Sequence, residues 1–390
     1  MPSPRTGPTP TTIGHMLPPP FPRTLTIHPM RLGVPFGRLH GREHGMPRHL
    51  AIVRICALLG IAPLVLAFEG SLAAQPAQAP IIDMHMHAPH ADDQGPPPVW
   101  LCPGTVFPVM QPGGSWPDTF MEFLKRPTCA TPISSPMTDR ELMDRTFAVM
   151  NRRNVYGVVS GPMTEDWHKA STARVIPSLG FELGAPNALS PAAVREAFKS
   201  GRFRVFGEVA NQYRGVEPGD AAFDPYLAIA EELDIPMSIH VGTGPPGAPY
   251  LGFPRYRARL HSPLVIEEAL LRHPKLRVSL MHAGWPMIDD LLAVMWTHPQ
   301  VYVDVGAISF VLPRVAFHEY LKRIVDAGFG ARVMFGSDQM VWPEALETAI
   351  QAIEQATFLS ADQKRDIFYN NAARFLKLTD AEMSRHKGLR

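Results

Sequence analysis

Two histidines alternate with apolar residues near the start of a buried-looking segment, in the sequence Asp83-Met-His85-Met-His87. Side chains on a β-strand repeat with a period of two, so His85 and His87 would point to the same face of a strand that begins at Ile81. Two imidazoles on one face at the end of a strand can hold one metal ion from one side. For an isolated His-x-His the alternative is a pair of ordinary core histidines, so the rest of the chain must decide.

Four more imidazole or carboxylate side chains follow short apolar segments later in the chain: Glu208, His240, His282 and Asp338. Each has an ordinary explanation on its own. Glu208 could pair with Arg204 at a rim, the two histidines could be satisfied in a core, and Asp338 could cap a turn. Their recurrence at the ends of successive apolar segments, together with the His-x-His, favours a metal site with mixed imidazole and carboxylate ligands.

The segments that would position these residues alternate between strand and helix. The predicted strands are mostly continuous apolar runs, which is typical of a parallel sheet buried on both faces. The first begins at 81, and the others lie at 155–160, 174–181, 203–209, 236–241, 276–281, 301–305 and 331–335. Predicted helices lie at 139–151, 190–199, 226–233, 264–272, 285–297 and 362–376.

Eight strands with helices between them predict an α/β protein with a closed (β/α)8 TIM barrel. An open doubly wound sheet is the alternative, but it often carries a Gly-rich phosphate turn after its first strand, and none is present here. The candidate ligands follow strands one, four, five, six and eight. Only a closed barrel brings those five carboxyl ends around one point, where barrel active sites lie.

A long segment, 88–138, separates the first strand from the first helix. It is rich in proline and aromatic residues. Loops of this length inside a compact domain are usually functional, so we predict a lid over the active-site face, with a surface excursion as the alternative. Its two cysteines, Cys102 and Cys129, could form a disulfide in an oxidising compartment or remain free thiols.

The first 79 residues differ from the rest. Residues 1–45 are rich in proline and arginine without apolar periodicity, so we interpret them as a disordered leader that is dispensable or not translated. Residues 46–79 combine a basic start, a short apolar run and an Ala-x-Ala site, which predicts a secretory signal peptide. The alternative is an uncleaved membrane anchor. The barrel is then expected at 80–378, a C-terminal tail at 379–390, and the product in the periplasm or secreted.

Composition sets limits on function. Of the 390 residues, 45% are hydrophobic and 19% charged, which is enough to build a sizeable core. The formal net charge of +1 gives no overall attraction to nucleic acid or acidic membranes. We therefore expect a small-molecule substrate, no nucleic-acid partner and no stable membrane insertion. A monomer and a homo-oligomer both stay open.

The combined motifs resemble the amidohydrolase superfamily. The Asp-x-His-x-His start, the Ile-His, Met-His-Ala-Gly and Phe-Gly-Ser-Asp segments, and the Asn-Ala-Ala-Arg-Phe-Leu close are similar to its amidohydrolase-related branch, which includes aminocarboxymuconate semialdehyde decarboxylase. The resemblance spans about 80–378. It implies that His85, His87 and His240 bind metal, and that Asp338 binds metal and transfers a proton. His282 would bind a second metal or polarise the substrate.

Strand four is where many members of that superfamily place a carboxylated lysine or a glutamate that bridges two metal ions. Glu208 occupies this place, so the resemblance permits either one or two metal ions. The ligand types suit zinc, with manganese or iron as alternatives. For substrate contacts we predict Arg255, which could bind a carboxylate, and Trp285 and Trp342, which follow candidate strand ends.

Three function classes follow from these residues. The first is a metal-dependent hydrolase that uses activated water on an amide, lactone or ester bond. The second is a metal-dependent decarboxylase of a small unsaturated or aromatic acid on the same scaffold. The third, a binding protein without catalysis, is disfavoured by the intact ligand set. Glu208 favours hydrolysis over decarboxylation, because a bridged metal pair suits the formation of hydroxide.

Overall fold

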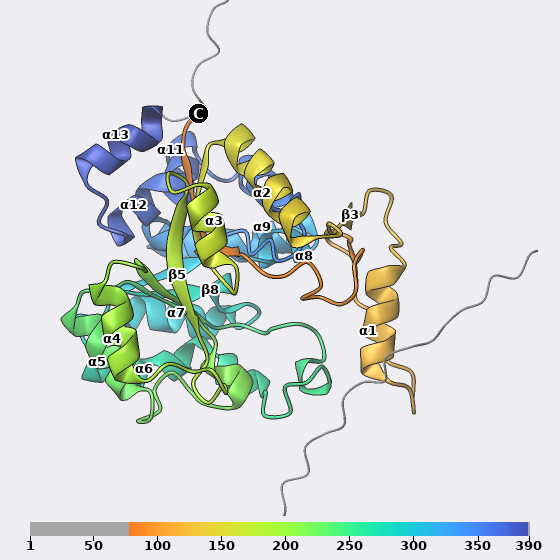
Figure 1. Cartoon of the computed structure of the whole chain (residues 1–390), viewed down its shortest axis with the longest axis horizontal. Coiled ribbons are helices and arrows are strands. Elements are labelled where there is room, and N and C mark those ends of the chain that lie inside the picture. Colours follow the sequence, from red (N-terminus) through yellow and green to blue (C-terminus); the bar gives the residue numbers. More distant parts are fainter. Residues whose placement is uncertain (1–77, 389–390) are drawn as a thin grey trace, which may run out of the picture. The chain divides into compact units, whose positions relative to one another are not determined.

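A parallel sheet of eight strands forms the centre of the protein. The computed structural model describes residues 78–388 (Figure 1). Within them, the strands of the sheet lie in the order of the chain. Its strands are β1 (Ile81–His87), β4 (Val155–Ser160), β5 (Val175–Phe181), β6 (Val205–Val209), β7 (Met237–His240), β8 (Val278–Met281), β9 (Val301–Asp304) and β10 (Val333–Met334). Each lies within or next to a predicted segment.

The sheet closes into a barrel at its first and last strands. The backbone N–H of Met84 donates to the carbonyl of Phe335 at 2.9 Å, and that of Asp338 donates to the carbonyl of His85 at 2.7 Å. These bonds join β1 to the residues that follow β10. The predicted (β/α)8 barrel is therefore confirmed.

Helices connect the strands, and several begin where the sequence predicts. Thr138 and Ser190 cap α2 (Asp139–Arg153) and α4 (Pro191–Lys199), and each hydroxyl accepts a backbone N–H of the first turn. Other helical segments are α3 (Thr164–Ala170), η1 (Asn211–Arg214), α5 (Asp224–Glu232), η2 (Ala248–Tyr250), η3 (Ala258–His261), η5 (His282–Gly284), α7 (Ile288–Thr297), α8 (Ile308–Val311), α9 (Arg314–Ile324), η6 (Val325–Phe329), η7 (Gly330–Arg332) and α10 (Ala345–Glu354).

Two predicted helices are interrupted. The segment 264–272 consists of η4 (Pro263–Ile266) and α6 (Glu267–Arg272). The segment 362–376 consists of α11 (Ala361–Arg365), the wider turn η8 (Asp366–Asn370) and α12 (Asn371–Phe375). The predicted helix 285–297 begins three residues late, at Ile288, because 282–284 form a separate turn. Residues 379–390, expected as a tail, contain α13 (Asp380–Gly388).

The 88–138 insertion has its own small framework. A two-stranded antiparallel sheet pairs β2 (Trp100–Leu101) with β3 (Ile133–Ser134), and α1 (Trp116–Lys125) lies between them in the chain. A disulfide joins Cys102 to Cys129, which answers the question left open by the sequence. The indole N–H of Trp116 donates to the carbonyl of Pro246 at 2.8 Å, so the insertion contacts the loop that follows β7. Its role as a lid stays a prediction.

The core lies between the sheet and the surrounding helices. A large buried cluster includes Val159, Phe206, Ile239 and Leu280 from neighbouring strands. A smaller cluster packs Ile82, Met84 and Met334 against the C-terminal elements η8 and α12. No helix among residues 78–388 is long and apolar enough to cross a membrane. The predicted leader, and the signal peptide up to residue 77, lie outside the described residues.

Candidate metal centre

One group of donor atoms forms where β1 meets the loop after β10. His85 Nε2 and His87 Nε2 are 3.2 Å apart. Asp338 Oδ1 lies 3.1 Å from His87 Nε2 and 3.8 Å from His85 Nε2. The three side chains therefore place one atom each around a common point, and we call them the first donor group.

A second donor group faces the first from β7 and from η5, the turn that follows β8. His240 Nδ1 and His282 Nε2 are 3.1 Å apart. Glu208 Oε1, from β6, lies 2.5 Å from His240 Nδ1 and 3.9 Å from His282 Nε2. The other oxygen of this carboxylate, Oε2, lies 3.4 Å from His87 Nε2 and 3.8 Å from His85 Nε2. Glu208 thus contributes one oxygen to each donor group.

Hydrogen bonds on the outer side of the His85 and His282 rings determine their tautomer. The nitrogen that faces the centre is then the one without a proton. Asp304 Oδ1 lies 3.3 Å from His85 Nδ1, and the carbonyl of Gly306 lies 3.0 Å from His282 Nδ1. Both acceptors require a proton on Nδ1, so in the neutral rings Nε2 carries a lone pair that points to the centre. This is the tautomer that binds a metal ion through Nε2.

The carboxylates and imidazoles at the centre shift one another's pKa values. Burial opposes ionisation of Glu208, but hydrogen bonds with His240 and His282 outweigh it and hold its pKa well below the usual range. Burial also opposes charge on His85, yet the Asp338 carboxylate raises the His85 pKa well above its usual value. The His240 pKa is lowered by burial and by His282. A metal cation can replace the protons that these carboxylates attract to the rings, which makes the affinity for metal dependent on pH.

The backbone is strained where it presents these side chains. His282 has φ 57° and Asp338 has φ 54°, values that L-residues seldom adopt. Such conformations cost of the order of 1–3 kcal/mol and gather at functional sites. Space is also reserved for His85: a Cβ added to Gly306 would lie 2.6 Å from its Nδ1, and one added to Gly336 would lie 2.9 Å from its Cβ.

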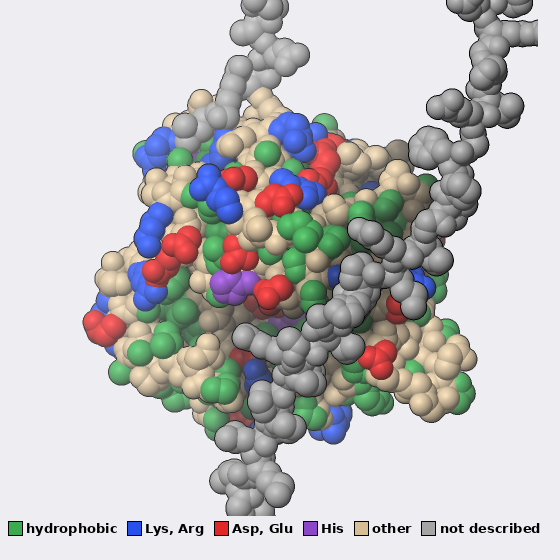
Figure 2. Space-filling view, turned by 45° about the vertical axis from the view of Figure 1, so that its right-hand side comes forward, with side chains coloured by type: hydrophobic (Ala, Val, Ile, Leu, Met, Phe, Trp, Pro, Cys, Tyr) green, Lys and Arg blue, Asp and Glu red, His purple; other side chains and the backbone are tan. Residues whose placement is uncertain are grey.

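The donor set fits a divalent metal ion of the zinc type. Pairs of ring nitrogens approach within hydrogen-bonding distance of each other and of carboxylate oxygens, and two rings are fixed with a lone pair inward. Imidazole nitrogen with carboxylate oxygen is a ligand combination typical of zinc and of related transition metals. His85 is buried, whereas the side chain of His87 is 21% exposed, so solvent reaches the centre from one side. Histidine and acidic side chains reach the surface around a hollow in Figure 2.

An aromatic wall stands beside the second donor group. Tyr213, on η1, packs edge-to-face against His240 with ring centroids 5.1 Å apart. Phe253, Tyr256 and His261 surround the Tyr213 ring at 4.8, 5.3 and 5.6 Å. Burial, and then the negative charge of the Glu208 carboxylate, raises the Tyr213 pKa well above its usual value, so the phenol stays protonated.

The three predicted substrate contacts lie outside the two donor groups. Arg255 is exposed, on the loop after β7. Trp285 is partly buried against the core, directly after η5. Trp342 is almost wholly buried, and its indole N–H donates to the carbonyl of Val99 at 3.2 Å, so its polar atom is already used by the insertion. Contact of any of the three with a substrate stays a prediction.

Sequence reasoning missed two residues that position ligands. Asp304 Oδ1 receives, besides the ring of His85, the backbone N–H groups of His282 and Gly306. Gln339 bonds the backbone of His87 on both sides, through its carbonyl oxygen and its amide nitrogen. Asp304 ends the seventh strand, and that position could have drawn attention to it.

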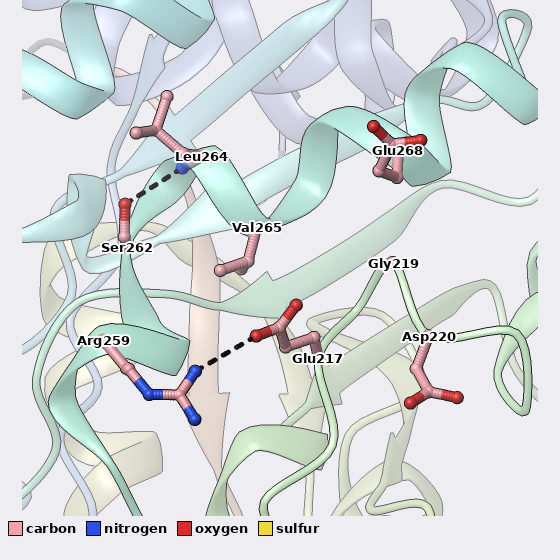
Figure 3. Close-up of a pocket in the computed structure, with 8 residues that line it drawn as sticks. All are labelled: Glu217, Gly219, Asp220, Arg259, Ser262, Leu264, Val265 and Glu268. Carbon is pink, nitrogen blue, oxygen red and sulfur yellow. Dashed lines mark hydrogen bonds and ion pairs between the residues drawn. The ribbon is translucent and has the colours of Figure 1, made fainter.

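A surface depression of about 450 Å³ lies apart from the metal ligands. It is lined by loop residues and by parts of η3, η4 and α6 (Figure 3): Glu217, Gly219, Asp220, Arg259, Ser262, Leu264, Val265 and Glu268. Glu217 pairs with Arg259 at 3.6 Å, and none of the candidate ligands lines this depression.

Comparison with known proteins identifies the family of this chain. A family model described as amidohydrolase matches residues 82–378. The chain belongs to this amidohydrolase family. The family consists of enzymes that are generally metal-dependent, which confirms the predicted superfamily and, at this general level, the prediction of an enzyme.

Solved structures share the barrel at low identity. An uncharacterized TIM-barrel protein from Bordetella bronchiseptica is 18% identical, with a TM-score of 0.53 over 78% of this chain and 100% of the other. A 2,6-dihydroxybenzoate decarboxylase is 12% identical, with a TM-score of 0.48 over 77% and 100%. A probable 2-pyrone-4,6-dicarboxylic acid hydrolase from Acinetobacter baumannii is 14% identical, with a TM-score of 0.46 over 76% and 99%. A search of curated proteins gave no match. The first structure supports the fold alone.

Proposed function

We propose that the protein is a metal-dependent hydrolase that cleaves an amide, lactone or ester bond of a small molecule, and that Glu208 would help to hold two metal ions. The observation that carries this proposal is the position of the Glu208 carboxylate, with Oε1 in one donor group and Oε2 in the other. Such a shared carboxylate suits a metal pair, and two-metal sites are a recurrent arrangement for hydrolysis.

The residues of the two groups have separate tasks. The first donor group and Glu208 Oε2 would hold one ion, and His240, His282 and Glu208 Oε1 would hold the other. When bound, a divalent metal ion supplies Lewis acidity that makes water a stronger nucleophile at neutral pH. Asp304 and the Gly306 carbonyl keep the rings of His85 and His282 in the orientation that binding needs.

Asp338 is the group placed to move a proton. Burial raises its pKa, but the charge of His85 and the hydrogen bond with His87 outweigh burial and lower it, so the carboxylate is ionised at neutral pH. Its Oδ1 faces His87 Nε2, whereas Oδ2 lies 3.9 Å from His282 Nδ1. We assign Oδ2 to accept a proton from the attacking water and to return it to the leaving group.

Metal content and product analysis test this function together. The protein is loaded with zinc, its zinc content per chain is measured, and it is assayed against lactones, esters, amides and aromatic acids. We expect about two zinc ions per chain and turnover of the first three classes. Glu208→Gln should lower the content towards one ion, since a neutral amide cannot bridge as a carboxylate does. Release of carbon dioxide from the acids without hydrolysis would identify a decarboxylase instead.

We also propose that the protein acts outside the cytoplasm. The Cys102–Cys129 disulfide supports this, because disulfides persist mainly in oxidising compartments. Mass analysis of the protein from cells should find an N-terminus between about Ala74 and Ile81. A cytoplasmic product that retains Met1 would contradict export.

A further inference from the structure

Tyr213 differs from the other tyrosines in how its hydroxyl is used. The chain has eight tyrosines, and Tyr250 is exposed. Each of the six that remain besides Tyr213 has a hydroxyl hydrogen bond: Tyr156, Tyr226, Tyr256, Tyr302, Tyr320 and Tyr369. Among residues 78–388 no partner contacts the Tyr213 hydroxyl within hydrogen-bonding geometry. The Tyr213 oxygen is not among the buried unpaired side-chain atoms of the described residues, so it is accessible to solvent and free to bond a small molecule.

The position of Tyr213 relates the hydroxyl to the metal centre. The residue lies on η1, which follows β6 at the carboxyl end that carries Glu208. Its ring is fixed by His240 on one side and by Phe253, Tyr256 and His261 around it. The side chain is partly exposed, so it is open to a small molecule at the barrel mouth.

Gly244 leaves space for this hydroxyl. A Cβ added to Gly244 would lie 2.1 Å from the Tyr213 oxygen, so any other residue there would displace the phenol. The neighbouring Tyr256 hydroxyl accepts the Gly244 N–H at 2.8 Å and holds that loop in place. The loop thus accommodates the Tyr213 oxygen without bonding it.

We propose that the Tyr213 hydroxyl donates a hydrogen bond to the substrate oxygen on which negative charge develops, beside the second donor group. This proposal rests on the proposed function. It makes Tyr213 a candidate catalytic residue and favours substrates whose reacting carbonyl presents its oxygen to the aromatic wall. A donor held in place before the reaction stabilises developing charge without a reorganisation cost.

Tyr213→Phe removes the donor and keeps the ring. In the zinc-loaded full-length chain we expect kcat on the best hydrolysed substrate to fall by about 10²-fold, with KM within a few-fold of the wild type. Zinc content and melting temperature should match the wild type, because the hydroxyl bonds no described residue. Tyr226→Phe is the matched control: its hydroxyl donates to the carbonyl of Leu189, away from the centre, and kcat should not change.

A second measurement does not depend on turnover. Inorganic phosphate presents anionic oxygens, and its affinity for the zinc-loaded proteins is measured by calorimetry. We expect binding to be about tenfold weaker in Tyr213→Phe and unchanged in Tyr226→Phe, because hydrogen bonds to charged groups are among the stronger ones. Equal phosphate affinity in wild type and Tyr213→Phe, including no binding by either, overturns the proposal whatever the turnover.

The two measurements separate this inference from the function on which it rests. If the wild type hydrolyses no lactone, ester or amide but binds phosphate more tightly than Tyr213→Phe, the donor role stands and the hydrolase function fails. If hydrolysis occurs and phosphate affinity is equal in both proteins, the function stands and the donor role fails.

Discussion

The two ends of the barrel both carry charged and polar clusters, but they use them differently. At the amino ends of the strands, opposite charges pair at the surface: Arg277 Nε lies 2.7 Å from Asp234 Oδ1, and Arg204 Nη1 lies 2.5 Å from Glu382 Oε1. At the carboxyl ends, ring nitrogens face each other at 3.1–3.2 Å, and buried Asp304 Oδ2 and His240 Nε2 have no partner among the described residues.

The ion pairs at the amino ends stabilise the fold, whereas the clustered groups at the carboxyl ends lower its stability. Pairs at the amino ends satisfy each other. The carboxyl-end groups are largely buried and compete for the same protons, whereas positive φ occurs at both ends, in Asp234 (52°) as in Asp338 (54°). A protein tolerates such conflict where function requires it. The comparison therefore predicts that substitutions at the carboxyl ends change metal content and chemistry, whereas those at the amino ends change stability.

The largest expected effect is from His85→Ala. His85 Nε2 contacts atoms of both His87 and Asp338, so its loss removes a ligand from the first donor group. Hydrolysis should fall to background and zinc content should drop by at least one ion per chain, while the metal-free variant unfolds at a denaturant concentration close to that of the metal-free wild type. Full zinc content in His85→Ala would contradict the assignment of this centre.

Asp338→Asn should separate chemistry from binding. The amide keeps an oxygen for coordination but cannot accept a proton near neutral pH. We expect kcat to fall by about 10²–10⁴-fold, the usual range for loss of a general base, with most of the zinc retained. If instead kcat is near normal and only the melting temperature falls, Asp338 merely shapes the turn after β10.

Asp304→Asn should have a smaller effect that acts through His85. The neutral amide is a weaker acceptor for the Nδ1 proton, and loss of such a supporting partner typically costs 10–100-fold in metal affinity. Competition with a zinc chelator measures this affinity. Asp234→Asn, at the amino ends, is the control: it should leave zinc affinity unchanged. A wild-type affinity in Asp304→Asn would show that His85 is oriented by packing alone.

The strands could be predicted well because apolar runs at regular spacing report burial directly. The segment 155–160 matches β4 residue for residue. The six candidate ligands were predicted because each lies at or just after the end of a predicted strand. Helices were harder. Thr379 and Glu382 form reciprocal capping bonds at the start of α13, and this Thr-x-x-Glu pattern is visible in the sequence, but the prediction for 379–390 is a tail.

The supporting residues could not be predicted, for a physical reason. Spacing shows that a residue ends a strand, but not whether its side chain binds a metal ion or orients another side chain. Asp304 contacts His85 across 219 positions of sequence. That the Tyr213 hydroxyl has no hydrogen-bond partner among the described residues can be seen only in the folded structure. The same limit applies to Trp342, whose contact with Val99 depends on how the insertion packs.

The smallest effect concerns pH and the helix that closes the amino end. His386, on α13, stacks on Tyr156 with ring centroids 3.8 Å apart, and its Nδ1 lies 3.1 Å from the Tyr369 hydroxyl. Burial lowers the His386 pKa to about 4. The unfolded chain, with a histidine pKa near 6.5, then binds more protons than the folded chain between those two values. The free energy of unfolding should therefore fall as the pH falls from about 6.5 to about 4.

His386→Phe isolates this contribution. The ring can still stack on Tyr156 but cannot take up a proton, so between pH 7 and pH 4.5 the variant should lose about 2 kcal/mol less stability than the wild type. The measurement is urea unfolding of the metal-free proteins at both pH values, which keeps the metal-centre histidines common to the two. Equal pH dependence in both proteins would mean that α13 accommodates the charged ring, and the amino end would then be less tightly closed than its contacts indicate.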